Sequence, residues 1–217
     1  MHTRFFAGVG GAVAAMCAVS PVRAVDGWSL WDHALPAITH LADDSARPDP
    51  ADVPAPVQRF GTHGQEWLTV TAGYGHDFAR AHDMNLAVAY SRFLDDDFEW
   101  IIEAGAWYYD QRGDNAAALN AAMIFRYHLV NEDRWTFFVD LGIGVQVATD
   151  AVPQSAKHFG FTPRAGVGGT LRLDEGATRL IGGVRWHHVS NGHLWGDDDN
   201  DPHDAAVFYL GLMFRLP

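Results

Sequence analysis

Apolar and polar residues alternate along most of the chain from about residue 66 onward, in eight segments separated by turn-forming residues. Because the side chains of a β-strand point alternately to its two faces, this pattern predicts strands with one apolar and one polar face. Helical periodicity is nearly absent from this region, so the expected fold class is all-β. The expected strands cover residues 66–78, 84–94, 98–109, 116–130, 134–148, 158–173, 178–190 and 204–216.

The connections between these strands are of two kinds, tight polar turns and longer loops. The tight turns lie at 95–97, 131–133 and 174–177, and the clearly longer loops lie at 149–157 and 191–203. Outer-membrane barrels have short periplasmic turns, longer outer loops and an even number of strands. We therefore predict an eight-stranded antiparallel transmembrane β-barrel over residues 66–217. If the chain starts in the periplasm, the tight turns lie on that side and the longer loops lie outside.

Each expected strand has one long apolar face and one face with isolated charges. Alternation alone does not tell inside from outside, so a soluble barrel with its apolar faces inward is the alternative. Strand length favours the membrane, because these strands run about 11 to 15 residues and strands of soluble proteins average about 5 to 6. A small membrane barrel has room only for side chains, and charges inside it must be paired. The expected interior partners are Glu103 and Asp140 with Arg126, Arg164, Arg172 and Arg185.

Aromatic residues gather toward the ends of several expected strands. Such residues form interfacial girdles on the outside of membrane barrels, which also favours the membrane. The residues assigned to these girdles are Trp67, Trp100, Trp107, Tyr108, Tyr109 and Trp135.

Residues 1–24 have the pattern of a secretory signal peptide. Arg4 supplies the positive charge, residues 5–19 are apolar or small, and residues 22–24 fit a small-residue cleavage site. The alternative is a buried helix of the mature fold. The single cysteine, Cys17, lies in this segment, so the mature protein is expected to have no cysteine and no disulfide.

The chain is acidic, with a net charge of −12 at pH 7. Removing Arg4 and Arg23 with the signal peptide leaves 13 basic and 27 acidic residues, a net charge of about −14. This balance argues against nucleic acid as a partner. No apolar run after residue 24 approaches the ~20 residues of a membrane helix. A membrane-spanning form must therefore be a closed barrel.

Residues 25–65 form an N-terminal extension with a different pattern. Apolar residues recur at helical spacing between Trp28 and Leu41, and residues 43–56 hold four prolines among Asp and Ala. We expect a short helix followed by an extended linker. The helix either lies in the membrane interface or packs on the domain.

A histidine, a serine and an asparagine crowd the end of the seventh expected strand, at His188, Ser190 and Asn191. His188 and Ser190 share a face that is otherwise apolar and outward. A serine is a weak nucleophile until a base takes its proton, and the base is oriented by a carboxylate. Asp204, at the start of the eighth strand, has the parity to face His188, and Asp201 in the preceding loop is the alternative.

Two other histidines compete with His188 for the role of base. His187 points inward by parity, and His193 lies in the loop after the strand. Neither position is on the outward face that Ser190 occupies.

The eight strands and the sequence His188-Val-Ser-Asn191 resemble the lipid A 3-O-deacylase (PagL-like) family of the outer membrane, over roughly residues 61–216. The resemblance implies that His188 is the base, Ser190 the nucleophile, and Asn191 with Gly192 the holders of the oxyanion. The acid of the family is typically a glutamate at the start of strand eight. No glutamate follows Glu175 here, so aspartate must take this role.

The resemblance implies a serine esterase that removes an ester-linked acyl chain from lipid A, the membrane anchor of lipopolysaccharide, at the outer leaflet of a Gram-negative outer membrane. It implies no metal and no other cofactor. The alternatives are a phospholipase-type barrel hydrolase, which calcium dependence favours, and a small barrel without catalysis. The acidic run 197–201 is either a solvated loop, a calcium site, or a contact to ions that bridge lipopolysaccharide phosphates. The sequence sets neither acyl-length preference nor oligomeric state.

Overall fold

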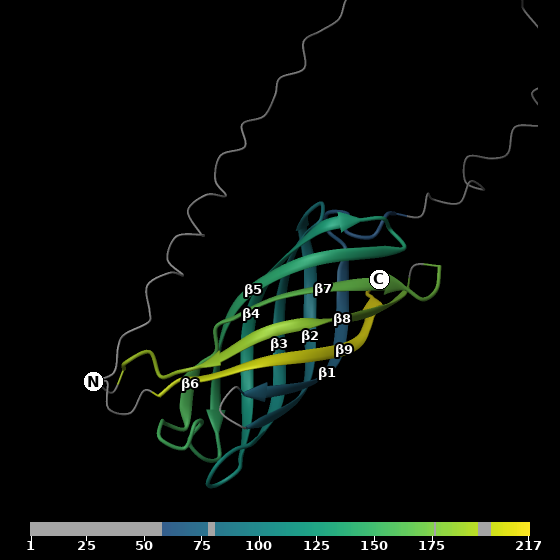
Figure 1. The fold of residues 1–217 in the computed structure, drawn as a ribbon. Coiled ribbons are helices and arrows are strands. Elements are labelled where there is room, and N and C mark those ends of the chain that lie inside the picture. The colour runs from purple at the N-terminus through teal and green to yellow at the C-terminus, as the bar shows by residue number, and fades with distance from the viewer. Residues whose placement is uncertain (1–57, 78–80, 176, 195–200) are drawn as a thin grey trace, which may run out of the picture. The chain divides into compact units, whose positions relative to one another are not determined.

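The computed structural model describes residues 58–77, 81–175, 177–194 and 201–217. Within those residues, antiparallel strands follow one another around a single sheet (Figure 1). Their bounds are β1 Glu66–Asp77, β2 His82–Asp95, β3 Phe98–Asp110, β4 Ala116–Asn131, β5 Trp135–Ala148, β6 Phe159–Phe161, β7 Arg164–Arg172, β8 Thr178–Val189 and β9 His203–Arg215. The sheet closes on itself, because β1 pairs with β9 and β4 pairs with β5.

The sixth wall strand is formed by β6 and β7 together, so the barrel has eight strands as predicted. Phe161 pairs with Val145, and Arg164 pairs with Gly142, so the register on β5 is the same before and after the break. The interruption falls at residues 162–163, where Pro163 lacks the N–H that a ladder requires. The predicted strand 158–173 is therefore correct in extent and register but not continuous, and the other strand bounds agree within two residues.

The outer wall of the barrel is apolar, and the charges are inside. Leu119, Leu141 and Phe208 are 65% exposed or more, which is the pattern of a wall that faces lipid and excludes the soluble alternative. Inside, Arg126 pairs with Glu99 and Asp140, Arg185 with Glu103 and Asp140, and Arg164 with Glu103.

One predicted interior partner is wrong. Arg172 pairs with Asp133 at the tight-turn end of the barrel, and both side chains are partly exposed. Arg172 is the last residue of β7, so its long side chain reaches the turn next to it instead of the lumen. Glu99, which was not assigned a partner, takes part in the interior network with Arg126.

Three of the six aromatic residues predicted to form the interfacial girdle face outward, and three do not. Trp100, Tyr108 and Trp135 face outward, whereas Trp67, Trp107 and Tyr109 are buried in the lumen. The latter three lie near strand ends, but their parity is that of the inward residues. Facing, not position along the strand, decides which aromatic residues meet the membrane interface.

Residues 58–65 of the predicted extension close the tight-turn end of the lumen. Phe60 is buried against Trp67 and Phe93, and the guanidinium of Arg179 lies 3.9 Å from the Phe60 ring centre. The predicted signal peptide 1–24, the helix between Trp28 and Leu41, and the linker 43–56 lie outside the described residues. Among the described residues, no helix is long and apolar enough to cross a membrane.

Candidate active site

The centre of the candidate site is the pair formed by His188 on β8 and Asp204 on β9. The two residues are direct cross-strand partners, and His188 Nδ1 lies 2.9 Å from Asp204 Oδ1. Both side chains are on the outward face and partly exposed. The register of two neighbouring strands therefore brings into contact the two side chains that sequence parity placed on the same face.

A third side chain, Trp186, contacts both members of this pair. Its indole Nε1 donates to Asp204 Oδ1 at 2.8 Å, so the indole and the imidazole share one carboxylate oxygen. The Trp186 and His188 ring centres lie 5.4 Å apart. The sequence places Trp186 on the apolar outward face but does not by itself predict this contact. Trp186 pairs with Ala206, so Asp204, two residues away on the same face, is its diagonal neighbour and lies within reach of a long side chain.

Ser190 follows His188 by two residues on the same face and is half-buried. Its backbone is fixed by two hydrogen bonds with Phe161, one from the Phe161 N–H at 2.7 Å and one to the Phe161 carbonyl at 3.1 Å. Among the described residues, its hydroxyl makes no hydrogen bond with His188. The structure thus brings the candidate base and the candidate acid together and fixes the backbone of the candidate nucleophile two residues after His188.

Asn191 and Gly192 begin a tight turn directly after the serine. Gly192 and His193 have successive positive φ angles of 64° and 61°, and the Leu194 N–H donates to the Asn191 carbonyl at 3.3 Å. This is the φ pattern of a type I′ turn, which requires a positive φ at both central positions and is dominated by Gly, Asn and Asp. The buried Asn191 side chain stabilises the turn, because its Oδ1 accepts the His193 N–H at 2.8 Å.

The competing candidates lie elsewhere. His187 is buried in the lumen, stacked on Trp107 at 4.1 Å between ring centres, as its parity predicted. His193 belongs to the turn after Ser190, and Asp201 is exposed and precedes β9. Residues 197–200 of the acidic run lie outside the described residues.

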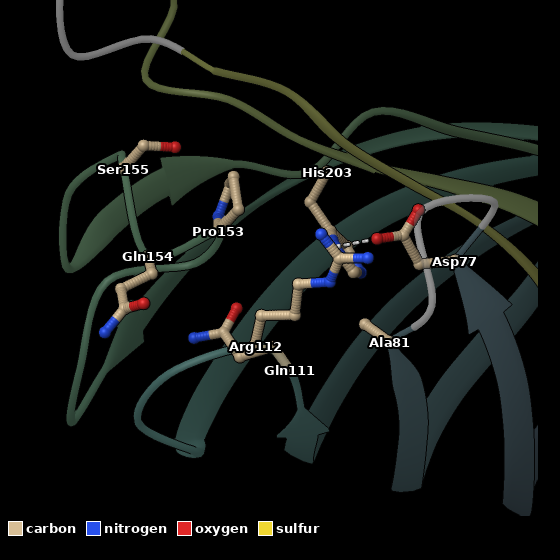
Figure 2. Close-up of a pocket in the computed structure, with 8 residues that line it drawn as sticks. All are labelled: Asp77, Ala81, Gln111, Arg112, Pro153, Gln154, Ser155 and His203. Carbon is tan, nitrogen blue, oxygen red and sulfur yellow. Dashed lines mark ion pairs between the residues drawn. The ribbon is translucent and has the colours of Figure 1, made fainter.

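A second histidine–carboxylate cluster, which the sequence analysis missed, lies inside the barrel. His203 Nε2 lies 2.8 Å from Asp83 Oδ2, and His203 Nδ1 lies 3.5 Å from Asp77 Oδ2. His203 also lines a cavity of about 450 Å³ at the long-loop end, with Gln111, Arg112 and residues 153–155 on its other side (Figure 2). The inward parity of residue 203 was the available signal.

Both the cavity and the outward pair are near the long-loop end, but they open to different surroundings. The cavity is reached from the barrel mouth, whereas the outward pair lies on the wall that faces lipid. An insoluble ester has its apolar part in the membrane, so the outward pair is the site that fits a lipid substrate.

Comparisons with known proteins agree with an outer wall that faces the membrane. The family model described as lipid A 3-O-deacylase (PagL) matches residues 83–213. The barrel is similar to the solved outer membrane enzyme PagL, with 19% identity, a TM-score of 0.50, and coverage of 69% of this chain and 99% of that chain. It is also similar to Neisserial surface protein A (NspA), with 8% identity, a TM-score of 0.53, and coverage of 70% and 96%.

No curated protein matches the chain. At these identities the two solved structures bear on the fold alone. The family match and the apolar outer wall place the protein in the outer membrane of Gram-negative type.

Proposed function

Because the chain belongs to the lipid A 3-O-deacylase (PagL) family, we propose that it is a serine esterase that hydrolyses the 3-O-linked acyl ester of lipid A. The observation that carries this proposal is the His188–Asp204 contact on the outer wall, two residues from Ser190. An outward base beside an outward serine fits an ester whose acyl chain lies in the membrane.

The hydrogen bond between His188 and Asp204 supports the roles that we propose. In this proposal Asp204 accepts a hydrogen bond from the protonated Nδ1 of His188. The unprotonated Nε2 is then available to take the proton of a hydroxyl group. His188 takes the proton of Ser190 as its oxygen attacks the ester carbonyl. The protonated imidazole then donates to the departing sugar oxygen, and the acyl group stays on Ser190. Water, activated by the same histidine, releases the fatty acid and restores the serine.

The oxyanion of the two tetrahedral intermediates requires donors close to Ser190. Gly192 and Asn191 occupy this place in the chain. On our proposal the donors are the Asn191 amide nitrogen and the Gly192 N–H, and the hydrogen bond from the His193 N–H to Asn191 Oδ1 orients that amide.

The test uses the purified, folded protein with lipopolysaccharide and, separately, with phospholipids. We expect fatty acid release from lipopolysaccharide at its 3-position ester and none from phospholipids, as measured by mass spectrometry of the lipid products. Release from phospholipids that stops on calcium chelation identifies a phospholipase-type hydrolase instead. No release from either lipid identifies a barrel without catalysis.

A further inference from the structure

The outer wall carries a cluster of polar rings at the long-loop end of β1 and β2. Tyr74, His76 and His82 face outward there, and Tyr74 is 51% exposed. The Tyr74 hydroxyl lies 2.6 Å from His82 Nδ1, and the rings of these two residues are stacked with centres 5.8 Å apart. The ring centres of His76 and His82 lie 5.0 Å apart. These three side chains form one group, the ring cluster.

The ring cluster is the neighbour of the candidate catalytic pair on the outer wall. Ala206 on β9 pairs with Trp186 on β8 and with His76 on β1, and His76 pairs with His82 on β2. The small side chain of Ala206 is therefore what stands between His76 and the indole that donates to Asp204. Since neighbouring strands lie about 4.8 Å apart, His76 is about 10 Å from Trp186 along the wall.

The row of paired residues rises from the candidate pair toward the polar surface. Trp186 lies three residues before the end of β8, whereas His76 is the next-to-last residue of β1 and His82 is the first residue of β2. The strands of a closed barrel are tilted, so a row of direct pairings climbs along the barrel axis. A ligand that follows this row therefore leaves the apolar wall and reaches the level of the polar head groups.

The Nε2 atoms of the two histidines offer one acceptor and one donor. His76 Nδ1 contacts the carbonyl oxygen of Asp77, which only accepts, so in the neutral ring the proton is on Nδ1 and Nε2 is an acceptor. The Tyr74 hydroxyl can donate to His82 Nδ1, which makes Nε2 of His82 a donor. A sugar hydroxyl both donates and accepts, so it matches this pair of nitrogens.

The charges around the ring cluster favour a neutral ligand group over a phosphate. Asp110 pairs directly with His82, and Asp204 is the diagonal neighbour of His76 on the same face. These two carboxylates repel an anion, whereas they do not repel a hydroxyl group. The surface therefore fits the sugar of a polar head better than its phosphate.

From this arrangement, and resting on the proposed function, we infer that the ring cluster binds the sugar part of the substrate through its hydroxyl groups. The ester that Ser190 attacks lies at the end of β8, and the sugar extends from it over β9 to β1 and β2. Tyr74, His76 and His82 are then specificity-determining residues, because an ester without a sugar cannot use them.

The experiment gives each variant two substrates, lipopolysaccharide and p-nitrophenyl butyrate, an ester without a sugar. His76→Phe and His82→Phe keep an aromatic ring on the wall but remove the imidazole nitrogens. Tyr74→Phe removes the hydroxyl that contacts His82. Tyr127→Phe is its matched control, since Tyr127 is also outward and 49% exposed but lies near the tight-turn end of β4. Folding of each variant is checked by heat-dependent gel migration.

The measured quantity is kcat/KM for lipopolysaccharide divided by kcat/KM for p-nitrophenyl butyrate. We expect this ratio to fall about tenfold in His76→Phe and in His82→Phe, the value of one to two neutral hydrogen bonds. The KM for lipopolysaccharide should carry the loss, because the sugar is held alike in the ground state and the transition state. Tyr74→Phe should lower the ratio less, and Tyr127→Phe should keep the wild-type ratio.

Lipopolysaccharide without its phosphates should give the same falls, and falls that disappear with the phosphates overturn the assignment to sugar. An unchanged ratio in both histidine variants, or an equal fall in Tyr127→Phe, overturns the inference about the ring cluster alone. A wild-type protein that releases no fatty acid from lipopolysaccharide overturns the proposed function, and the inference with it.

Discussion

Two histidine–aspartate pairs meet at the start of β9, where the adjacent residues His203 and Asp204 face opposite ways. His188 and Asp204 are outward, 2.9 Å apart, with side chains 19% and 39% exposed. His203 and Asp83 are inward, 2.8 Å apart, with side chains 1% and 0% exposed. The two contact distances are nearly the same, although His188 uses Nδ1 and His203 uses Nε2. The two pairs therefore differ mainly in what can reach them.

His203 and Asp204 are neighbours in the sequence, and they face opposite sides of the wall because β-strand side chains alternate. The outward pair lies two residues from Ser190 on the lipid-facing wall, whereas the inward pair joins β9 to β1 and β2 through Asp77 and Asp83. On the proposed function, the first pair takes part in acyl transfer and the second supports the start of β9.

The largest effect should follow from removing the candidate nucleophile or base. We expect Ser190→Ala and His188→Ala each to lower kcat by about 10⁶-fold, since the members of a serine triad act as a unit. Both variants should still migrate as folded, heat-modifiable barrels. Near-normal fatty acid release by either variant would exclude its residue from the chemistry.

The next effect tests which carboxylate completes the outward pair. Asp204→Asn keeps the shape of the side chain but loses the charge that orients His188, so we expect a loss in kcat of up to about 10⁴-fold. Asp201→Asn should lose much less, because Asp201 is exposed and outside β9. Full activity in Asp204→Asn with a loss in Asp201→Asn would move the acid into the loop. A loss in neither would indicate a Ser–His dyad.

The inward pair should affect stability instead of chemistry. Asp83→Ala leaves the buried His203 without its 2.8 Å partner, and we expect the free energy of unfolding to fall by about 2 kcal/mol. Denaturant unfolding in detergent measures this change, and acyl release is then compared per folded molecule. A variant as stable as the wild type but catalytically dead would reverse the roles assigned to the two pairs.

The smallest effect should come from the tryptophan that shares the carboxylate with His188. Trp186→Phe keeps a ring beside His188 but removes the 2.8 Å donor to Asp204, and we expect kcat to fall about tenfold, the value of one hydrogen bond to a charged group. KM should stay nearly constant, because Trp186 orients the acid. The pH profile of kcat should shift if the donor holds the carboxylate charge in place. A change in KM alone would indicate that Trp186 binds lipid.

Much of this molecule was predictable because strand alternation is a local property. The eight strands, their bounds, and the facing of His187, His188 and Asp204 all follow from parity. The wrong assignments have the same origin, since Trp67 was placed by its distance from a strand end and not by its face.

Other features depend on how the barrel closes, which no local pattern contains. The contact of Trp186 with Asp204 and the His203–Asp83 pair require the register between distant strands. The outward row of Ser190, Phe161, Val145 and Ala121 requires more, because these four residues come together only through three successive pairings. Arg172 was misplaced because the reach of a terminal side chain into a turn is also invisible in the alternation.

The filled lumen has a consequence for the permeability of the membrane. Ion pairs cross the interior of the described barrel from Arg126, Arg164 and Arg185 to three carboxylates. The cavity between Arg126, Arg185 and Tyr209 is only about 20 Å³, about the room that one water needs. Because the described ion pairs fill this level of the lumen, we expect the protein not to make the outer membrane permeable to small solutes.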